Sequence, residues 1–303
     1  MSQATSSQPK ILLLGSQGQV GEELQHILSS ASELMALSRS QLDLAHPQRL
    51  PDLIAEIQPQ VIINAAAYTA VDRAESEPEL AEIVNAKVPR ELAIAARQCH
   101  ALLVHLSTDY VFAGQQSTPY RETDPTAPLS VYGRTKLAGE EGIRQVWDRH
   151  LILRTAWVYG AYGKGNFVKT MLRLGAERSE LRVVADQVGS PTWAADLAGA
   201  IAHLVQHFQP DWAGTYHYTN SGVASWYDFA LAIFEEAHQR GFKLQVERVI
   251  PITTPEYPTP ATRPAYSVLN CQKISTLLGT APPHWRQSLR QMLTDLSTQN
   301  SST

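Results

Sequence analysis

Cysteine is scarce in this chain, and so are long apolar runs and an excess of either charge. Cys99 and Cys271 are the only cysteines among 303 residues, which is too few for a disulfide framework or a zinc-binding pattern. No apolar run approaches the roughly 20 residues that cross a bilayer. The first ten residues, MSQATSSQPK, lack the apolar core of a secretory signal. We therefore expect a cytoplasmic protein with reduced thiols that spans no membrane.

The charge balance excludes a further group of functions. With 25 basic and 29 acidic side chains the net charge is −4, so the chain has no general attraction for nucleic acid or for an anionic membrane surface. The ten histidines show no metal-binding spacing. We therefore expect a small-molecule partner and no nucleic acid.

The first half of the sequence alternates regularly between short apolar runs and segments with helical spacing. The runs predict parallel strands at Lys10–Leu14, Leu34–Leu37, Val61–Asn64, Ala101–Leu106 and from Leu151 onward. The helical segments between them are Val20–Leu28, Leu50–Ile57, Glu79–Gln98, with an adjustment near Pro89, and Tyr132–Val146. This alternation predicts an α/β fold with a Rossmann-type doubly wound parallel sheet.

After about residue 160 the rhythm becomes irregular. We expect helices at Phe167–Leu174, Ala194–Val205, Ser225–Glu236 and Trp285–Leu296, and strands at Arg182–Val184, Thr215–Tyr218 and Glu247–Ile250. Five prolines predict an extended loop over Pro251–Pro264, and the polar tail Ser297–Thr303 predicts disorder. We infer a dinucleotide-binding Rossmann domain at 8–160 and a smaller α/β substrate-binding domain at 161–298, with segments around 186–210 returning to the first.

Glycines are concentrated where such a sheet would bind a nucleotide. Gly15, Gly18 and Gly21 lie between the first strand and the first helix. Glycine there permits a tight turn and lets backbone amides approach a pyrophosphate, which the helix N-terminus also favours. The spacing is G-x-x-G-x-x-G rather than G-x-G-x-x-G, and a purely structural turn is the alternative. The position in the chain favours nucleotide binding.

Two further segments point to the same ligand. Arg39 follows the second strand, at a place where an acidic residue would favour NAD. A basic residue there favours the 2′-phosphate of NADP. The alternative is that Arg39 is simply a solvated surface residue. The segment 64–72, NAAAYTAVD, follows the third strand. Its small side chains would let a flat ligand lie against the backbone at the carboxyl end of the sheet.

A candidate acid catalyst follows the fourth strand. Tyr132 and Lys136 are four residues apart, which places them on one face of a helix. There the charge of Lys136 would lower the pKa of Tyr132, and the phenol would donate a proton to a carbonyl oxygen while hydride reaches the carbon. Thr108 or Ser107 would hydrogen-bond that oxygen. With 11 tyrosines in the chain, the pair is a weak signal without this context.

The sequence from about residue 10 to 296 resembles the dTDP-4-dehydrorhamnose reductase family of extended short-chain dehydrogenases. The matching segments are GSQGQVG at 15–21, NAAAYTAVD at 64–72, STDYVFAG at 107–114, YGRTKLAGE at 132–140, RTAWVYG at 154–160, DQVGSPT at 186–192 and TRPAYSVLN at 262–270. The resemblance implies an oxidoreductase that uses NADPH, with NADH as the alternative, to reduce the C4 keto group of dTDP-4-dehydro-β-L-rhamnose. The product would be dTDP-β-L-rhamnose, for nucleotide-sugar and cell-surface polysaccharide biosynthesis.

The resemblance also assigns roles to residues of this chain. The implied catalytic residues are Thr108, Tyr132 and Lys136. The expected cofactor-binding residues, which include the glycines and Arg39 discussed above, are Gly15, Gly18, Gln19, Val20, Gly21, Arg39, Asp43, Leu44, Ala67, Tyr68, Thr69, Tyr132 and Lys136. The implied dTDP-sugar contacts are Thr108, Asp109, Trp157 and Arg263, of which Arg263 suits a pyrophosphate. Pairing with a surface carboxylate is the alternative for Arg263.

Some family members bind magnesium through glutamates near a dimer interface. Glu23 fits one such position, but Ala195 stands where another glutamate would be expected. We therefore expect no metal site and no metal-bridged dimer, and either a monomer or a homodimer. Trp193, Trp212 and Trp226 are interpreted as packing residues.

Two other functions stay open at this point. The chain could reduce or epimerise a different nucleotide sugar, because relatives share the cofactor half and differ in the pocket. It could also be a non-catalytic NADP-binding regulatory subunit of the methionine adenosyltransferase type, which can keep the Tyr/Lys pair. The presence of Trp157 and Arg263 favours the enzyme.

Overall fold

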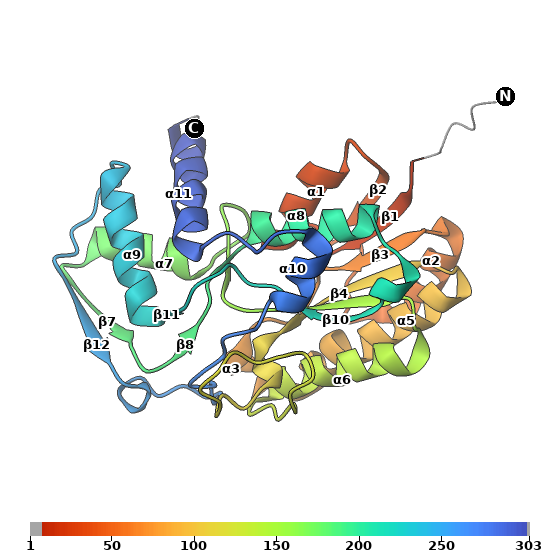
Figure 1. Cartoon of the computed structure of the whole chain (residues 1–303), viewed down its shortest axis with the longest axis horizontal. Helices are drawn as coiled ribbons and strands as arrows, with labels where there is room; N and C mark the ends of the chain where they lie inside the picture. Colours follow the sequence, from red (N-terminus) through yellow and green to blue (C-terminus); the bar gives the residue numbers. More distant parts are fainter. Residues whose placement is uncertain (1–7, 302–303) are drawn as a thin grey trace.

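Six apolar segments pair into one parallel sheet, the main element of the computed structural model, which describes residues 8–301 (Figure 1). The strands are β1 (Lys10–Leu14), β2 (Glu33–Leu37), β3 (Val61–Asn64), β4 (Leu102–Thr108), β5 (His150–Thr155) and β10 (Gly214–His217). Their order is β10-β5-β4-β3-β1-β2. The chain therefore reverses direction across the sheet between β1 and β3, where doubly wound sheets bind ligands. The predicted α/β, Rossmann-type fold is confirmed.

Alternate residues of the strands are buried on opposite faces, because successive side chains of a strand point to opposite sides. On one face Leu13 and Val104 pack against helices α1 (Gln19–Leu28) and α8 (Ala194–Gln206). On the other face Leu12 and Leu103 pack in the cluster that holds Ile54, Leu92 and Ile143. These belong to helices α2 (Leu50–Ile57), α5 (Val88–Gln98) and α6 (Val131–Val146). Both faces are thus covered, as a parallel sheet requires.

The chain returns to this sheet after residue 160. Helix α8 lies beside α1, and β10 extends the sheet next to β5. Strand β10 lies just beyond the range around 186–210 that we expected to return. The division into domains at 8–160 and 161–298 remains an interpretation of the sequence.

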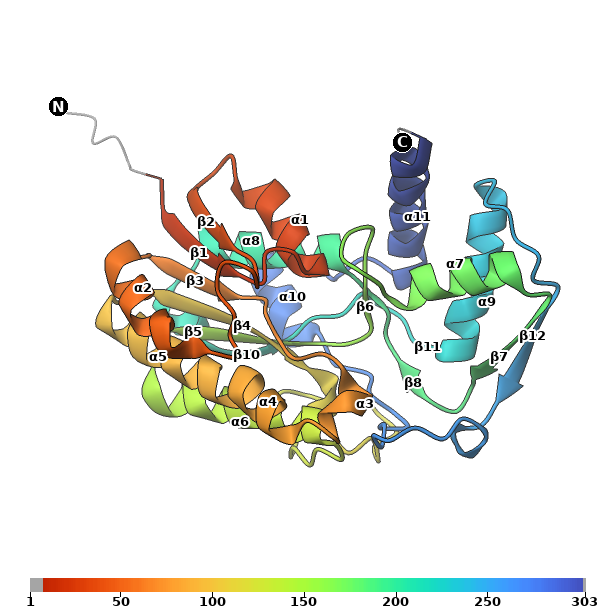
Figure 2. The ribbon, with the colours of Figure 1, turned by 180° about the vertical axis from the view of Figure 1, so that it is seen from behind.

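The smaller part of the molecule lies beside the carboxyl ends of the strands (Figures 1 and 2). It holds helices α7 (Phe167–Glu177), α9 (Trp226–Gln239) and α11 (Trp285–Ser301), and the parallel pair β7 (Glu180–Val184) and β12 (Arg248–Ile252). Short strands β6 (Val158–Tyr159), β8 (Val188–Gly189), β9 (Thr192–Trp193) and β11 (Ala224–Ser225) connect the two parts. Helices α3 (Val71–Ala74), α4 (Pro78–Glu82) and α10 (Gln272–Leu278) complete the structure.

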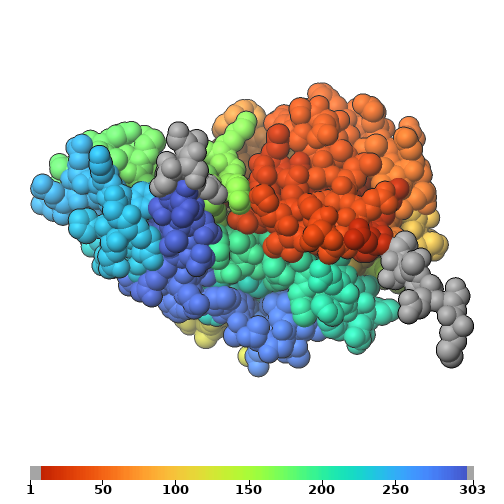
Figure 3. Space-filling view, turned by 90° about the horizontal axis from the view of Figure 1, so that it is seen from above, coloured from red at the N-terminus to blue at the C-terminus, as the bar shows by residue number. Residues whose placement is uncertain are grey.

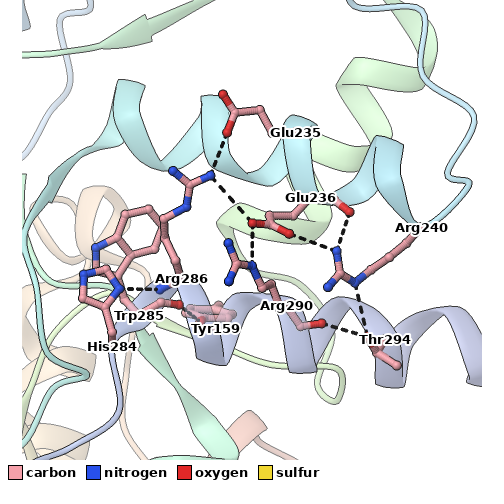
Figure 4. A network of polar contacts seen from close by, with 9 residues as sticks. All are labelled: Tyr159, Glu235, Glu236, Arg240, His284, Trp285, Arg286, Arg290 and Thr294. Carbon is pink, nitrogen blue, oxygen red and sulfur yellow. Dashed lines mark hydrogen bonds and ion pairs between the residues drawn. The ribbon is translucent and has the colours of Figure 1, made fainter.

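A buried carboxylate ties α9 to α11 in this smaller part (Figure 4). Glu236 of α9 is 2% exposed and accepts hydrogen bonds from Arg290 Nε of α11 at 2.7 Å and from Arg240 Nη1 at 3.0 Å. Arg286 lies farther away, at 3.7 Å, and is also paired with the exposed Glu235. The charge of Glu236 is therefore compensated where the two helices meet.

The structure corrects three expectations. The single helix expected over Glu79–Gln98 is divided into α4, a π-helical turn at Ile83–Lys87 and α5. Pro89 at the start of α5 has no amide to donate, so the regular helical bonding cannot continue through it. The proline-rich segment Pro251–Pro264 is not wholly a loop, because its first two residues complete β12 and Thr254–Glu256 form a 3₁₀ turn. The disorder expected over Ser297–Thr303 is wrong for 297–301, because α11 continues to Ser301, and residues 302–303 lie outside the described part.

The described residues stop short of both ends of the chain. Residues 302–303 and most of the N-terminal segment MSQATSSQPK lie outside them. Among residues 8–301, no helix is long and apolar enough to cross a membrane.

Candidate active site

A cleft of about 760 Å³ opens at the carboxyl ends of β1, β3 and β4, and residues of the smaller part also line it. This volume is typical of a cofactor or small-molecule site. Most of the residues predicted from the sequence line the cleft: Gly15, Gly18, Gln19, Val20, Arg39, Asp43, Leu44, Ala67, Tyr68, Thr69, Thr108, Asp109, Tyr132, Lys136 and Trp157. Gly21 and Arg263 are the two predicted residues that do not line it.

The glycine turn between β1 and α1 is too crowded for side chains. Gly15 has φ +79°, and a Cβ there would lie 2.7 Å from the Ala66 amide nitrogen. A Cβ at Gly21 would lie 2.1 Å from the Gly15 carbonyl oxygen, so Gly21 allows the turn and helix to pack rather than lining the cleft. Gly18 precedes α1 and provides no side-chain cap. Amides at the start of α1 are thus left to bind an anion.

Arg39 lies at the rim of the cleft, beyond β2. Its side chain is 77% exposed, and its Nε is 3.3 Å from Asp43 Oδ1. Asp43 also accepts a hydrogen bond from the Ala45 amide, and that bond is the main cause of the lowered pKa of its carboxyl group. An exposed ion pair of this kind contributes little stability, so Arg39 can leave it for a phosphate.

The loop after β3 is held by a residue that the sequence did not reveal. Asn85, in the π-helical turn, accepts a hydrogen bond from the Tyr68 amide at 2.9 Å and donates to the Tyr68 carbonyl at 3.1 Å. It also donates to Thr135 of α6 at 3.3 Å. The adjustment expected near Pro89 is the only sequence signal near this turn, and it does not single out Asn85. Asn85 thus fixes one wall of the cleft.

A loop from the smaller part closes the end of the cleft near the glycine turn. Asn166 Nδ2 donates to Gln19 Oε1 and to the Gly160 carbonyl, both at 2.8 Å. Figure 3 shows this segment, in yellow-green around residue 160, against the red N-terminal part. Lys164 of the same loop is exposed and lines the cleft. It is a basic residue near the anion-binding turn that the sequence did not single out.

Tyr132 and Thr108 meet at the chemical end of the cleft. Burial raises the pKa of Tyr132 to about 12, although the Thr108 hydroxyl acts to lower it. The expectation that Lys136 lowers the pKa of Tyr132 is therefore wrong. Ser107, the alternative to Thr108, donates its proton to Glu140 Oε1 at 2.6 Å. Thr108 is the hydroxyl that acts on the pKa of Tyr132, and it also donates to Asp109 Oδ1 at 3.0 Å.

Lys136 is 1% exposed and lies one helical turn after Tyr132. Its Nζ donates to the Leu106 carbonyl at 2.5 Å and lies 3.3 Å from His105 Nε2. Burial lowers the pKa of Lys136 to about 8, against the raising effect of Glu140. The ammonium form is therefore only moderately favoured near neutral pH.

The substrate end of the cleft contains a buried acid. Asp109 is 2% exposed, and burial raises its pKa to about 6. Its Oδ1 accepts a hydrogen bond from Thr108 at 3.0 Å, whereas no described residue satisfies Oδ2. Oδ2 is itself buried, and the Ser267 hydroxyl acts to lower the pKa of Asp109.

Trp157 and Trp226 form the opposite wall. Their rings stack with centroids 3.5 Å apart and planes within 7°. Trp157 has φ +48°, a left-handed conformation that costs energy for a bulky residue and is often found at functional sites. Trp226, interpreted from the sequence as a packing residue, packs in this way but also lines the cleft.

Arg263 is held near the cleft by a carboxylate. Its Nη1 and Nη2 donate to Asp72 Oδ1 and Oδ2 at 3.1 and 2.8 Å. Asp72 ends the segment NAAAYTAVD that follows β3. The arrangement is the carboxylate pairing that the sequence left as the alternative for Arg263, and a contact with pyrophosphate remains a prediction.

Glu23, the one residue that matched a metal-binding position, lies away from this cleft on α1. Burial raises its pKa to about 7, and Asp295 and Asp196 raise it further. Asp196 Oδ2 accepts hydrogen bonds from Asn220 and Ser288, and the neighbouring Ala195 offers no ligand atom. Within residues 8–301, no three His, Cys, Asp or Glu side chains are grouped for a metal ion.

Comparisons with known proteins agree with this geometry. The family model described as "RmlD substrate binding domain" matches residues 9–298. The chain is 46% identical to dTDP-4-dehydrorhamnose reductase of Escherichia coli K12, over 95% of this chain and 98% of the relative. It is 43% identical to the enzyme of the same name from Burkholderia thailandensis, over 96% and 100%.

A solved structure shows the same relation. The dTDP-4-dehydrorhamnose reductase of Bacillus anthracis in complex with NADP has a TM-score of 0.88 and 39% identity, over 95% of this chain and 99% of that one. Sequence and fold therefore agree along nearly the whole chain. The chain belongs to the dTDP-4-dehydrorhamnose reductase family, matched by the RmlD substrate binding domain model.

Proposed function

We propose that this chain reduces the C4 keto group of dTDP-4-dehydro-β-L-rhamnose and so produces dTDP-β-L-rhamnose for cell-surface polysaccharide. NADPH supplies the hydride, with NADH as the alternative, and the reaction takes place in the cytoplasm. The observation that carries the proposal is the meeting of Thr108, Tyr132 and Lys136 in one cleft of a chain whose full-length relatives bear this enzyme name.

The cofactor is bound along the carboxyl ends of β1 to β4. The amides of the turn at Gly15, Gly18 and Gly21 hold its pyrophosphate, with Gln19 and Val20 at the start of α1. Arg39 binds the 2′-phosphate, and Asp43 and Leu44 flank the adenine. Ala67, Tyr68 and Thr69 lie along the opposite wall, and Lys136 binds the ribose next to the nicotinamide.

Tyr132 is the proton donor of the reaction. Its pKa of about 12 keeps the phenol protonated at neutral pH, which is the form that an acid catalyst of reduction needs. As C4 receives hydride, the carbonyl oxygen takes the phenolic proton and becomes the hydroxyl of the product. Thr108 donates a hydrogen bond to the same oxygen.

The remaining contacts select the sugar nucleotide. Asp109 Oδ2, which accepts no hydrogen bond from the described residues, accepts one from a sugar hydroxyl. Trp157, stacked on Trp226, forms the apolar wall against the sugar. Arg263 exchanges its half-exposed partner Asp72 for the pyrophosphate of the substrate, to which a guanidinium binds in a bidentate manner.

The test is a coupled assay of NADPH oxidation with dTDP-4-dehydrorhamnose generated in situ. We expect oxidation that depends on this sugar, with dTDP-rhamnose as the product. Turnover that yields a C4 epimer or requires another nucleotide sugar would favour the related reductases and epimerases. Absence of turnover with tight NADP binding would favour a regulatory subunit. Light scattering of the same sample distinguishes a monomer from a homodimer.

A further inference from the structure

His105 is a buried histidine beside the catalytic lysine that has no role in the steps above. It lies on β4 and is 1% exposed. One side of its ring faces Asn64 of β3, with 3.1 Å between His105 Nδ1 and Asn64 Nδ2. The other side faces α6, with 3.3 Å between His105 Nε2 and Lys136 Nζ. The imidazole therefore connects an amide on one strand to the lysine of the proposed active site.

The orientation of Asn64 determines which ring nitrogen carries the proton. Asn64 Oδ1 accepts a hydrogen bond from the Ala66 amide at 3.2 Å, so its Nδ2 is the atom that faces His105. An amide nitrogen can only donate, so Nδ1 of the imidazole must be its acceptor. A neutral imidazole has one N–H, and in His105 this proton is consequently on Nε2.

The Nε2–H group of His105 points at Lys136. An ammonium group has three donors and no acceptor, whereas an amine has a lone pair that can accept. The Leu106 carbonyl already takes a hydrogen bond from Nζ at 2.5 Å. The two contacts fit together only when Lys136 is an amine that donates to Leu106 and accepts from His105.

We propose that His105, fixed by Asn64, is a positioning residue that favours the amine form of Lys136, so that cofactor binding takes up a proton at Nζ. The proton-uptake step rests on the proposed function, in which Lys136 binds the cofactor ribose. When Lys136 becomes an ammonium, Nε2 of His105 must accept. The ring proton then moves to Nδ1, and Asn64 gives up its hydrogen bond from the Ala66 amide and turns its oxygen toward the ring. The net change is one proton taken from solvent.

The other groups around Lys136 do not account for an uncharged amine. On its own helix, Glu140 favours the ammonium form. Glu140 is itself paired with Arg154 of β5 at 2.7 Å and with Arg144 at 3.0 Å, so its negative charge is retained. The direction of the pKa shift of Lys136, which burial lowers, agrees with the hydrogen-bond argument.

Tyr132, Tyr110 and Asp109 are further titratable groups on this side of α6. The phenol of Tyr132 is uncharged at neutral pH. Asp109, which follows β4, raises the pKa of both Tyr132 and Tyr110. On the strand side, His105 itself stays neutral because burial holds its pKa well below the ordinary value. His105 is thus the one group on β4 whose proton position depends on the charge of Lys136.

The first experiment measures the pKa of Lys136 in the ligand-free protein, from the ¹³C NMR signal of its Cε, assigned with Lys136→Met. We expect a pKa below the ordinary lysine value. His105→Gln can present an oxygen to Nζ and should raise that pKa by about one unit. Asn64→Asp should shift it in the same direction, because a carboxylate requires the Nδ1–H form of His105.

His150→Gln is the matched control, because it replaces another buried histidine by glutamine. His150 is the first residue of β5. It should leave the Lys136 signal unchanged. The inference is overturned if both Asn64→Asp and His105→Gln leave the pKa of Lys136 where it is, or if the wild-type value is already ordinary. Should one of the two variants fail to fold, the other and the wild-type titration still decide.

The second experiment measures proton uptake on cofactor binding by calorimetry in buffers of different ionisation enthalpy. NADH is the ligand, because it has no 2′-phosphate to titrate, and the pH is set about half a unit above the measured pKa of Lys136. The wild type should take up a substantial fraction of a proton, and His105→Gln should take up less. Binding without uptake in the wild type overturns the inference and leaves the proposed function standing. Absence of any cofactor binding defeats the proposed function, while the NMR titration still decides the inference.

Discussion

Tyr132 and Lys136 have opposite pKa shifts with the same main cause. Burial disfavours the charged form of each group, so it raises the pKa of Tyr132 to about 12 and lowers that of Lys136 to about 8. A protonated phenol suits a reductase, which must deliver a proton. A lysine that titrates near neutral pH suits a site in which a ligand changes its charge.

Replacement of Tyr132 tests the proton donor directly. Tyr132→Phe keeps the ring and its edge-on contact with Tyr110 but removes the hydroxyl. We expect kcat to fall by at least about 100-fold, the usual contribution of an acid catalyst, with nearly unchanged affinity for NADPH. Steady-state kinetics and fluorescence titration measure the two quantities. A rate within a few-fold of wild type would remove Tyr132 from this role.

Arg39 determines the choice between cofactors in our proposal. Arg39→Met keeps an unbranched, flexible side chain and removes the charge that would pair with the 2′-phosphate. We expect the KM for NADPH to rise by about tenfold, which corresponds to the loss of about 1.4 kcal/mol from one charge-assisted contact. The KM for NADH should change little and is the internal control. Equal effects on both cofactors would mean that Arg39 does not read the 2′-phosphate.

At the scale of elements, a break in a helix positions the wall of the cleft. The π-helical turn Ile83–Lys87 directs Asn85 toward the Tyr68 backbone and toward Thr135 of α6. A regular helix over the same residues would rotate this side chain away by part of a turn. Such π-helical insertions often occur at functional sites, and here the insertion joins the cofactor loop to the helix that carries Tyr132 and Lys136.

In the smaller part, the network around Glu236 joins α9 to α11 (Figure 4). Glu236→Gln would leave Arg240 and Arg290 without their buried counter-charge. Both arginines are partly exposed, so solvent reduces the cost, and we expect a loss of about 1–2 kcal/mol in the free energy of unfolding. Urea denaturation measures it. Glu235→Gln, on the exposed side of the same helix, should change stability by less than about 0.5 kcal/mol. Similar losses in both variants would contradict the assigned role of Glu236.

At the scale of the whole molecule, the cleft lies between the sheet and the smaller part, and the two are linked above the glycine turn. Asn166 binds Gln19, and Gln19 Nε2 donates to the Val158 carbonyl at 3.3 Å. Because α8 and β10 return to the sheet, the chain passes between the two parts more than once. We infer that the two parts unfold together.

Cofactor binding tests this cooperativity. NADPH at 100 times its Kd should stabilise the folded protein by about 2.7 kcal/mol and raise Tm by roughly 5 °C for a chain of this size. Differential scanning calorimetry should show one transition that moves as a whole. Two transitions of which only one moves would mean that the parts unfold independently. No shift at saturating NADPH would contradict cofactor binding itself.

The sequence by itself determined the alternation of strands and helices, the glycine turn and the order of Thr108, Tyr132 and Lys136. These features are local, since apolar periodicity and turn chemistry depend on neighbouring residues. Most of the site residues that it led to, through the resemblance to a family with long motifs, line the cleft. It missed Asn85, Lys164 and the cleft-lining role of Trp226, because nothing in their local pattern marks them.

Only the tertiary structure decided the pKa shifts and the hydrogen-bond partners of the side chains in the site. The pKa of Tyr132 is raised rather than lowered because burial outweighs any local charge. Arg263 donates a hydrogen bond to Asp72, which lies 191 residues away in the chain. His105 of β4 contacts Lys136 of α6. Burial and contacts of this kind depend on how elements distant in sequence pack together, and the hydrogen-bond orientation that assigns the proton of His105 follows from that packing.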